Sequence, residues 1–141
     1  MRLTRPALLL LLIVSGCSRH AQQPLCPKHI ELPFYPPIAA VAHITGTVTL
    51  TLTIDADGRV ADVKAETAGS RIFESTTIAN ARRWTFAKPV SSPVTQALVY
   101  DYKIDDSVPM DGPTKVTLDL PRVTIVASAR SVQTNSSPKK D

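Results

Sequence analysis

Cysteine is scarce in this sequence, with Cys17 and Cys26 the only two in 141 residues. That number excludes a fold stapled by several disulfides. Histidine is scarce too, and His20, His29 and His43 are spaced too widely for a zinc site. His43 is the one candidate base near the predicted fold, and a lone histidine at the start of a strand is usually structural or exposed. Because a glycine-rich phosphate loop is also lacking, the sequence gives no positive sign of an enzyme, and we predict no metal and no cofactor.

No apolar run in the sequence is long enough to span a bilayer. The longest, Ala7–Val14, follows a basic start and precedes small residues, which is the pattern of a secretory signal. The ending VSGC, residues 14–17, resembles the bacterial lipobox, in which the cysteine becomes an acylated N-terminus; a plain signal peptide is the alternative. The resemblance implies removal of residues 1–16 and a membrane anchor of acyl chains, palmitate among them, on Cys17. Because Ser18 rather than aspartate follows, it also implies the outer membrane, facing the periplasm.

The excess of positive charge is small. The chain has 16 lysines and arginines against 12 aspartates and glutamates, and the predicted signal removes Arg2 and Arg5 but no acid. The mature chain would therefore carry 14 basic and 12 acidic residues, a formal charge of +2. Charge gives no reason to predict nucleic-acid binding.

Proline is concentrated near the N-terminus, where residues 18–37 hold five of the twelve in the chain. Proline fixes φ and favours an extended residue before it. Residues 17–37 are therefore predicted to form a lipidated N-terminus and a short, extended tether. At the other end, residues 128–141 are rich in serine, asparagine and lysine and are predicted to be a disordered tail.

Two strands joined by a turn are predicted in the middle of the chain. Threonine alternates with apolar residues over residues 47–54, the period of a half-buried strand. Residues 59–66 alternate less regularly, with Ala61, Val63 and Ala65 placed on one face.

The linking sequence IDADGRV, residues 54–60, has two interpretations. Its two aspartates resemble the start of a calcium-binding EF-hand loop, but Arg59 takes a ligand position and Val60 stands where glycine is required. Asp57-Gly58 between alternating strands is instead a strong hairpin signal, because glycine adopts φ > 0 readily. We therefore predict a hairpin and no metal site.

One helix is predicted from about Ser70 to Trp84. The Ser70 hydroxyl can accept a hydrogen bond from a free backbone N–H of the first turn, and Pro89 prevents continuation. The positions that share one face at helical spacing are Phe73, Thr77, Ala81 and Trp84. Arg82 and Arg83 suit the C-terminal end of the helix dipole, a plainer explanation than a phosphate site.

A third strand is predicted over residues 95–104. A later segment, 115–127, could supply a further strand, which Pro121 would confine to an edge or break in two. The domain is thus predicted to span 38–106, followed by an extra strand segment over 107–127. The order strand, strand, helix, strand predicts an α+β fold, a small antiparallel sheet with one helix packed on one face.

A binding role is favoured by the exposed edges that such a sheet presents. An edge can accept an extended peptide as an added strand through main-chain hydrogen bonds. The predicted edge is the strand at 95–104; the alternative is that residues 115–126 cover it. The residues predicted to bind a partner there are Gln96, Leu98, Val99, Tyr100 and Tyr102. Small sheets can also exchange strands between protomers, which leaves a homodimer open.

Three segments, taken in order, resemble the C-terminal domain of the TonB family: Tyr35–Pro37, Ile44–Val60 and Ile72–Phe86. In that family a tyrosine-proline pair precedes an isoleucine-x-glycine-x-valine strand, an aspartate-glycine turn and a second strand. A helix follows that opens with phenylalanine and closes with arginine-x-tryptophan-x-phenylalanine or tyrosine. The matching positions here are Gly46, Asp57, Gly58, Phe73, Arg82, Trp84 and Phe86. The resemblance covers about residues 35–105.

The resemblance implies a periplasmic protein-interaction domain. Family members couple the inner-membrane proton-motive force to outer-membrane transporters by pairing a strand with the transporter's extended N-terminal segment. The implied partner is therefore an envelope protein such as a TonB-dependent transporter, and Trp84 and Phe86 are implied to pack the helix end onto the sheet. The family's membrane-spanning helix and long proline-rich arm are replaced here by a lipobox and a short tether. A lipid-anchored interaction module is the leading hypothesis; a true energy transducer and an unrecognised envelope enzyme are the alternatives.

Overall fold

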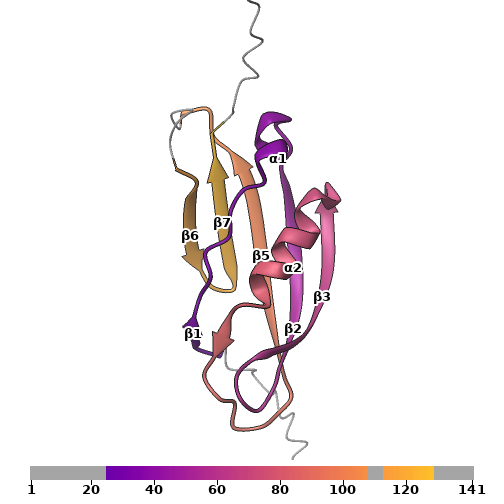
Figure 1. Cartoon of the computed structure of the whole chain (residues 1–141), viewed down its shortest axis with the longest axis vertical. Helices are drawn as coiled ribbons and strands as arrows, with labels where there is room; N and C mark the ends of the chain where they lie inside the picture. The colour runs from indigo at the N-terminus through magenta and orange to yellow at the C-terminus, as the bar shows by residue number, and fades with distance from the viewer. Residues whose placement is uncertain (1–24, 108–112, 129–141) are drawn as a thin grey trace, which may run out of the picture.

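The computed structural model describes residues 25–107 and 113–128, and these form seven strands and two short α-helices (Figure 1). In chain order the elements are β1 (Pro27–His29), α1 (Pro37–Val41), β2 (Gly46–Ile54), β3 (Val60–Gly69), α2 (Glu74–Ala81), β4 (Thr85–Phe86), β5 (Val94–Ile104), β6 (Lys115–Asp119) and β7 (Arg122–Ala127). A single 3₁₀ turn, Arg71–Phe73, leads into α2. The predicted α+β class is confirmed.

The main sheet has five strands in the order β3-β2-β5-β7-β6. Its neighbours are antiparallel except β5 and β7, which are parallel. The sheet predicted as antiparallel is therefore mixed, since the added strand β7 runs parallel to β5. The segment 115–127 does break at Pro121, into the hairpin β6–β7. The second strand of this hairpin, not the first, lies beside β5, and it runs in the same direction as β5.

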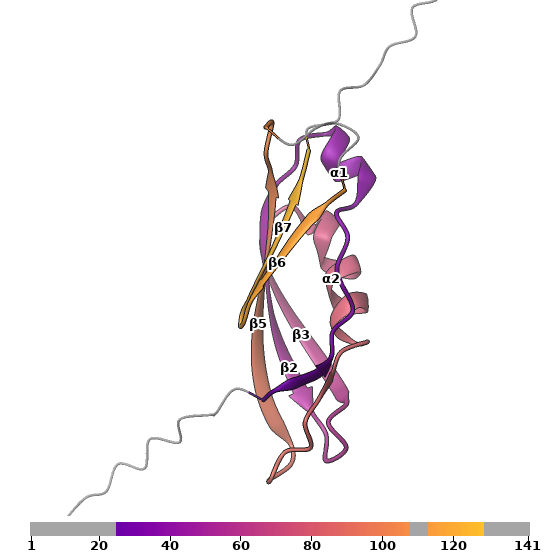
Figure 2. The same ribbon diagram turned by 90° about the vertical axis from the view of Figure 1, so that its left-hand side faces the viewer.

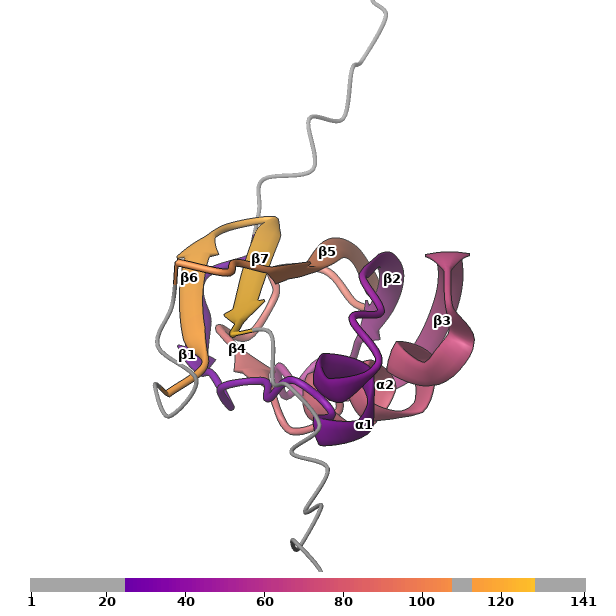
Figure 3. The same cartoon turned by 90° about the horizontal axis from the view of Figure 1, so that it is seen from above.

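All described helices and the N-terminal segment lie on one face of this sheet (Figures 2 and 3). Side chains of β2, β5 and β7 alternate between that covered face and the opposite one, as their period of two requires. The fully buried side chains on the covered face include Val48, Leu50, Leu52, Ile54, Leu98, Tyr100, Tyr102, Val123 and Ile125. No described element covers the opposite face (Figure 2), where the threonines of β2 point.

The turn between β2 and β3 is the hairpin predicted from the sequence. The Asp55 carboxylate Oδ1 accepts hydrogen bonds from the backbone N–H groups of Asp57 and Arg59, both at 2.9 Å. Gly58 has φ of +82°, and a Cβ at this position would lie 2.2 Å from the carbonyl oxygen of Phe86. Glycine is therefore required at this position for two reasons, its conformation and the close approach of β4.

A bulge changes the predicted faces of β3. Thr53 pairs with Asp62, whereas the next residue of β2, Ile54, pairs with Val60. Ala61 is the extra residue and lies exposed, so it does not share a face with Val63 and Ala65 as predicted.

The predicted helix 70–84 is present but shorter. The Ser70 hydroxyl accepts from the N–H of Ile72 at 3.4 Å, which confirms the predicted cap, but the residues it caps form a 3₁₀ turn. The α-helical part ends at Ala81. The predicted buried face is confirmed, since Phe73, Thr77, Ala81 and Trp84 are all fully buried.

The predicted tether is wrong over residues 25–37, because this segment packs on the domain. β1 pairs with β4, Tyr35 is 5% exposed, and the Tyr35 hydroxyl donates to the carbonyl of Ile44. Pro36 and Pro37 then begin α1, a helix of five residues that is too short to give a periodic signal. The tertiary contacts of this segment are not visible in its composition.

The predicted signal peptide, residues 1–16, Cys17 and the C-terminal tail beyond residue 128 lie outside the described residues. Within the described ranges, no helix has the length and apolar character needed to cross a membrane.

Candidate protein-interaction surfaces

The strand predicted to be the binding edge is not an edge over most of its length. Val99–Ile104 of β5 pair with β7, and the N–H of Val99 donates to the carbonyl of Pro121 at 2.8 Å. The alternative kept open in the sequence analysis, that residues 115–126 cover this strand, is the correct one. The reason is that the outer main-chain groups of residues 99–104 are already used within the domain.

Three of the five side chains predicted to contact a partner on β5, those of Leu98, Tyr100 and Tyr102, belong instead to the core, whereas Gln96 and Val99 are half-buried. The Tyr102 ring stacks on Phe73 with centroids 4.2 Å apart, and its hydroxyl lies 2.9 Å from the Thr77 hydroxyl. Burial raises the pKa of the Tyr102 phenol. Leu98 and Tyr100 are buried as well. The Gln96 side chain accepts from the N–H of Leu25 at 3.2 Å, and so ties the N-terminal segment to the sheet.

A buried polar cluster holds the helix layer together, and sequence patterns did not predict it. Asn80 Oδ1 accepts from the Tyr100 hydroxyl at 2.9 Å and from Trp84 Nε1 at 3.2 Å. Asn80 Nδ2 and Trp84 Nε1 both donate to the carbonyl of Glu31, at 3.0 and 3.1 Å. Burial raises the pKa of Tyr100 well above its ordinary value. Three segments of the chain, namely the N-terminal segment, α2 with the turn after it, and β5, therefore meet at one amide side chain.

Several residues of the predicted family motif have structural roles. Gly46 lies where a Cβ would come within 3.2 Å of the carbonyl of Ala68 and 3.4 Å of the Phe73 ring. Trp84 and Phe86 are buried against the sheet, as the resemblance implied. Arg82, by contrast, is exposed. Arg82 matches the family motif in its position, directly after α2.

The first sheet edge that remains open is β3, which lies at the end of the strand order. Nine of its ten residues pair with β2, and no described strand pairs with its other side. Beside this edge, α2 and the preceding turn form a hollow of about 300 Å³ lined by Arg71, Glu74, Ser75 and Ile78. The hydrogen bond from the Thr67 hydroxyl to Glu74 Oε2, at 3.1 Å, shows that this side of α2 faces β3.

The second open edge is β6, at the other end of the sheet. It has five residues, and its antiparallel register with β7 runs from Lys115 opposite Val126 to Asp119 opposite Arg122. Leu118 and, at the hairpin tip, Leu120 are 40% and 38% exposed. Apolar side chains thus lie at a margin of the sheet that has no described neighbour.

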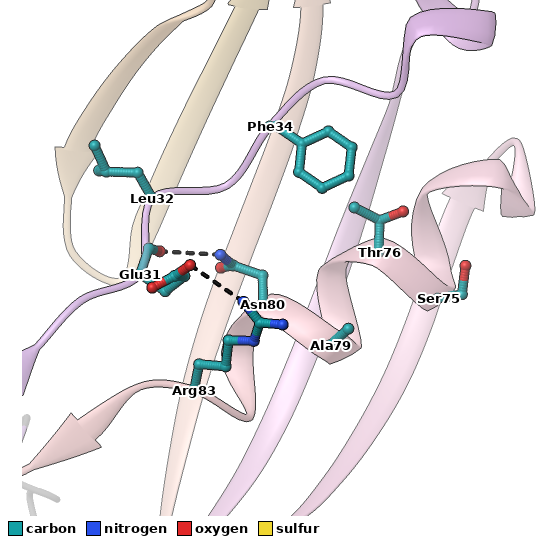
Figure 4. Close-up of a pocket in the computed structure, with 8 residues that line it drawn as sticks. All are labelled: Glu31, Leu32, Phe34, Ser75, Thr76, Ala79, Asn80 and Arg83. Atoms are coloured by element: carbon teal, nitrogen blue, oxygen red, sulfur yellow. Dashed lines mark hydrogen bonds and ion pairs between the residues drawn. The ribbon is translucent and has the colours of Figure 1, made fainter.

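A groove of about 330 Å³ separates α2 from the N-terminal segment (Figure 4). Arg83 and Glu31 close one end through an ion pair of 3.3 Å. Leu32 and Phe34 are 63% and 59% exposed along its rim. The groove therefore combines apolar side chains with one exposed ion pair.

The uncovered face of the sheet carries one structured charge cluster. Asp101 is only 8% exposed and accepts from the Thr47 hydroxyl at 2.7 Å and from Arg122 at 2.8 Å, with Lys103 Nζ at 3.5 Å. The Thr47 hydrogen bond and the two cations hold the pKa of Asp101 below its ordinary value, although burial opposes the shift. The cluster joins β2, β5 and β7 across this face.

No group of potential metal ligands occurs among the described residues. What the fold offers is a small α+β domain whose open sheet edges and apolar groove suit contacts with another protein, and this places it among protein-interaction domains. Residues 31–104, more than half of the chain, match the family described as Gram-negative bacterial TonB protein C-terminal. The chain belongs to this family, which confirms the resemblance read from the sequence. A comparison with curated proteins gives no match.

Family membership defines the general role of the chain. It is a TonB-like periplasmic protein-interaction module of the Gram-negative envelope, of the kind that takes part in TonB-dependent transport. The family is not one of enzymes. The matched residues begin inside the segment that was predicted to be a tether, in agreement with its packing on the domain. They end at residue 104, so β6 and β7 lie beyond the match.

Proposed function

We propose that the protein is a lipid-anchored adaptor that binds an extended segment of an envelope protein by β-strand addition at β3. The partner of first choice is a TonB-dependent outer-membrane transporter. The observation that carries this proposal is the length of β3, ten residues unpaired along one side. Because β7 occupies most of the outer side of β5, β3 is the longest free edge among the described strands.

The main-chain groups that β3 offers follow from the register. Val99 directs its N–H towards β7, so its neighbours Leu98 and Tyr100 direct theirs towards β2. Their partners on β2, Leu50 and Val48, therefore point to β5, and the threonines between them point to β3. Along β3 the residues bonded to those threonines alternate with Val63, Ala65 and Thr67. These last three residues direct their N–H and C=O groups outwards, free for an added strand.

Side-chain selectivity would come from the hollow beside β3. An added strand places alternate side chains on the covered face of the sheet, which here is the side of Glu74 and Ile78. The hollow of about 300 Å³ has room for one side chain of moderate size. Arg71 and Glu74 at its rim would favour a polar end on that side chain. Strand addition of this type combines main-chain affinity with side-chain pockets.

A lipid anchor would determine which envelope proteins the domain can reach. If Cys17 carries the acyl chains, the seven residues 18–24 link the membrane to the described domain. Fully extended, seven residues span at most about 25 Å. The domain would therefore stay close to the membrane surface, within reach of periplasmic segments of outer-membrane proteins. Substituting Cys17→Ala should release the protein from the membrane fraction, and retention would show that no lipid holds it there.

The binding mode can be tested by substituting proline on β3. Proline at Ala65 removes an outward N–H and leaves the β2–β3 pairing intact, since edge strands tolerate proline there. A photocrosslinking residue placed at exposed Ala68, in cells, would report the captured partner by mass spectrometry. We expect Ala65→Pro to abolish capture, while Val90→Pro in an exposed loop leaves it unchanged.

The result that contradicts the proposal is equally specific. Capture with unchanged yield from the Ala65→Pro variant, with normal amounts of folded protein, would show that the partner does not pair with β3. Failure of Cys17→Ala to alter fractionation would overturn the anchor but not the binding mode.

A further inference from the structure

The edge strand β6 has a sequence that is complementary to itself. Its residues are Lys115, Val116, Thr117, Leu118 and Asp119. When two such strands run antiparallel and are centred on Thr117, each lysine lies opposite an aspartate and each valine lies opposite a leucine. We propose that two copies of the chain pair through β6, antiparallel and centred on Thr117, to form one sheet continuous across a twofold axis.

The main-chain groups of β6 suit this register. The N–H of Val99 on β5 donates to the carbonyl of Pro121, at the start of β7. Along β7, therefore, Val123 and Ile125 point towards β5, and the residues between them point towards β6. Leu118 and Val116 lie opposite Val123 and Ile125, so their N–H and C=O groups point outwards.

Pairing centred on Thr117 joins those outward groups directly. Val116 of one copy lies opposite Leu118 of the second copy, and the reverse pair is generated by symmetry. Each is a hydrogen-bonded pair, in which both residues exchange their N–H···O bonds. A twofold axis makes the contact isologous, which closes the assembly at two copies.

Charge complementarity supports the same register. Lys115 of one copy lies opposite Asp119 of the second copy, twice in the dimer, and opposite charges in cross-strand pairs are stabilising. Among the described residues Lys115 forms no close ion pair, although its charge acts on Asp105, and Asp119 faces Arg122 across the hairpin. A shift by two residues in either direction would lose both Lys–Asp pairs.

Apolar side chains add to the contact on the covered face. Val116 packs partly against the core, so Leu118, two residues along the strand, lies on the same face. Leu118 is 40% exposed in one copy and would be covered by Val116 of the second copy. Leu32, 63% exposed, lies on the N-terminal segment that crosses in front of β6 and β7 (Figures 1 and 4).

The paired sheet would run from β3 of one copy to β3 of the second, with β6 of each at the centre. Both β3 edges remain free at the two ends. The inference therefore does not depend on what β3 binds. One dimer would therefore bind two copies of a partner, one at each β3 edge.

Crosslinking across the axis tests the pairing. In the proposed dimer, Thr117 lies opposite Thr117 of the second copy in a non-hydrogen-bonded pair. In such a pair the Cα atoms lie about 4.5 Å apart, within the range of about 4.4–6.8 Å that a disulfide needs. In the full chain, in a Cys26→Ser background that removes the exposed thiol, Thr117→Cys should form a disulfide dimer in the periplasm. Glu66→Cys, exposed on β3, is the matched control and should crosslink at least about tenfold less. Equal yields from the two positions would overturn the proposal.

A charge exchange tests the register. Asp119→Lys places like charges opposite each other twice, and we expect the crosslinked fraction of Thr117→Cys to fall about tenfold. The double variant Lys115→Asp/Asp119→Lys restores opposite charges and should restore crosslinking, which also shows that β6 still folds. An unchanged yield in the single variant, or no recovery in the double variant, would contradict the register centred on Thr117.

Discussion

Asn80 joins α2, the N-terminal segment and the sheet, and its removal gives a stability effect that can be worked out from the structure. Asn80→Ala deletes three hydrogen bonds, to the Tyr100 hydroxyl, the Trp84 indole and the carbonyl of Glu31. The indole and the Glu31 carbonyl still bond to each other at 3.1 Å. The Tyr100 hydroxyl loses the one partner shown for it while its ring stays fully buried.

The expected loss follows from these contacts. Each intramolecular hydrogen bond contributes about 1 kcal/mol net, and a buried group left without a partner costs about 1–3 kcal/mol. Two lost bonds and one orphaned Tyr100 hydroxyl should therefore lower the free energy of unfolding of Asn80→Ala by about 3–5 kcal/mol. Tyr100→Phe removes the hydroxyl but leaves Asn80 Oδ1 bonded to Trp84, so it should cost only about 1 kcal/mol.

The double variant makes the test decisive. Asn80→Ala/Tyr100→Phe contains no orphaned hydroxyl, so it should be more stable than the sum of the single effects by about 1 kcal/mol or more. Urea denaturation followed by the fluorescence of Trp84, the only tryptophan, measures all four proteins. Additivity within about 0.3–0.5 kcal/mol would refute the argument, because it would mean that the Asn80–Tyr100 bond contributes nothing.

Two further predictions concern the hairpin and the charge cluster. Gly58→Ala should destabilise the fold by about 3 kcal/mol or more, because the added Cβ meets the carbonyl of Phe86 at a φ of +82°; a loss below about 1 kcal/mol in urea denaturation would contradict this close approach. The pKa of Asp101 is lowered in the folded state, so its contribution to stability is present above the unfolded pKa and is lost as the pH falls through the folded pKa. Asp101→Asn should therefore destabilise the protein at pH 7, and the difference from the wild type in thermal unfolding should shrink in acid; a constant difference down to pH 2 would count against it.

The placement of β7 has a consequence for the role of this chain in its family. The strand at 95–104 is the binding edge predicted from the sequence, but β7 lies beside residues 99–104 of that strand. Strands β6 and β7 lie beyond the matched residues. With these two strands in place, the open edges of the sheet are β3 on one side and β6 on the other.

Local patterns predicted the elements wherever one face of an element is buried. Alternation over residues 47–54 predicted β2 with the correct buried face, because a half-buried strand must repeat every two residues. The spacing of Phe73 and Trp84 predicted the buried face of the helix. Asp57 and Gly58 predicted the hairpin, because the turn needs a residue that adopts positive φ. These signals depend only on neighbours in the sequence.

The N-terminal segment shows where such signals end. Residues 25–37 have the composition of a tether, yet Tyr35 is buried and the carbonyl of Glu31 binds two side chains of the helix layer. Backbone groups that bond to distant side chains leave no periodic trace in the sequence. Ala61 shows the same limit on a smaller scale, because a bulge arises from pairing with β2 and not from the residues of β3 alone.

The sequence by itself thus determined the α+β class, the order of β2, β3, α2 and β5, the hairpin at Asp57-Gly58 and the family, since each depends on local spacing. Only the tertiary structure decided which strands are edges. Whether β6 or β7 lies beside β5 depends on how a hairpin docks, and that is set by burial of Val123 and Ile125 against side chains more than 20 positions away. Free main-chain groups are a property of the assembled sheet, and strand order leaves them at β3 and β6, the two edges for which binding is proposed.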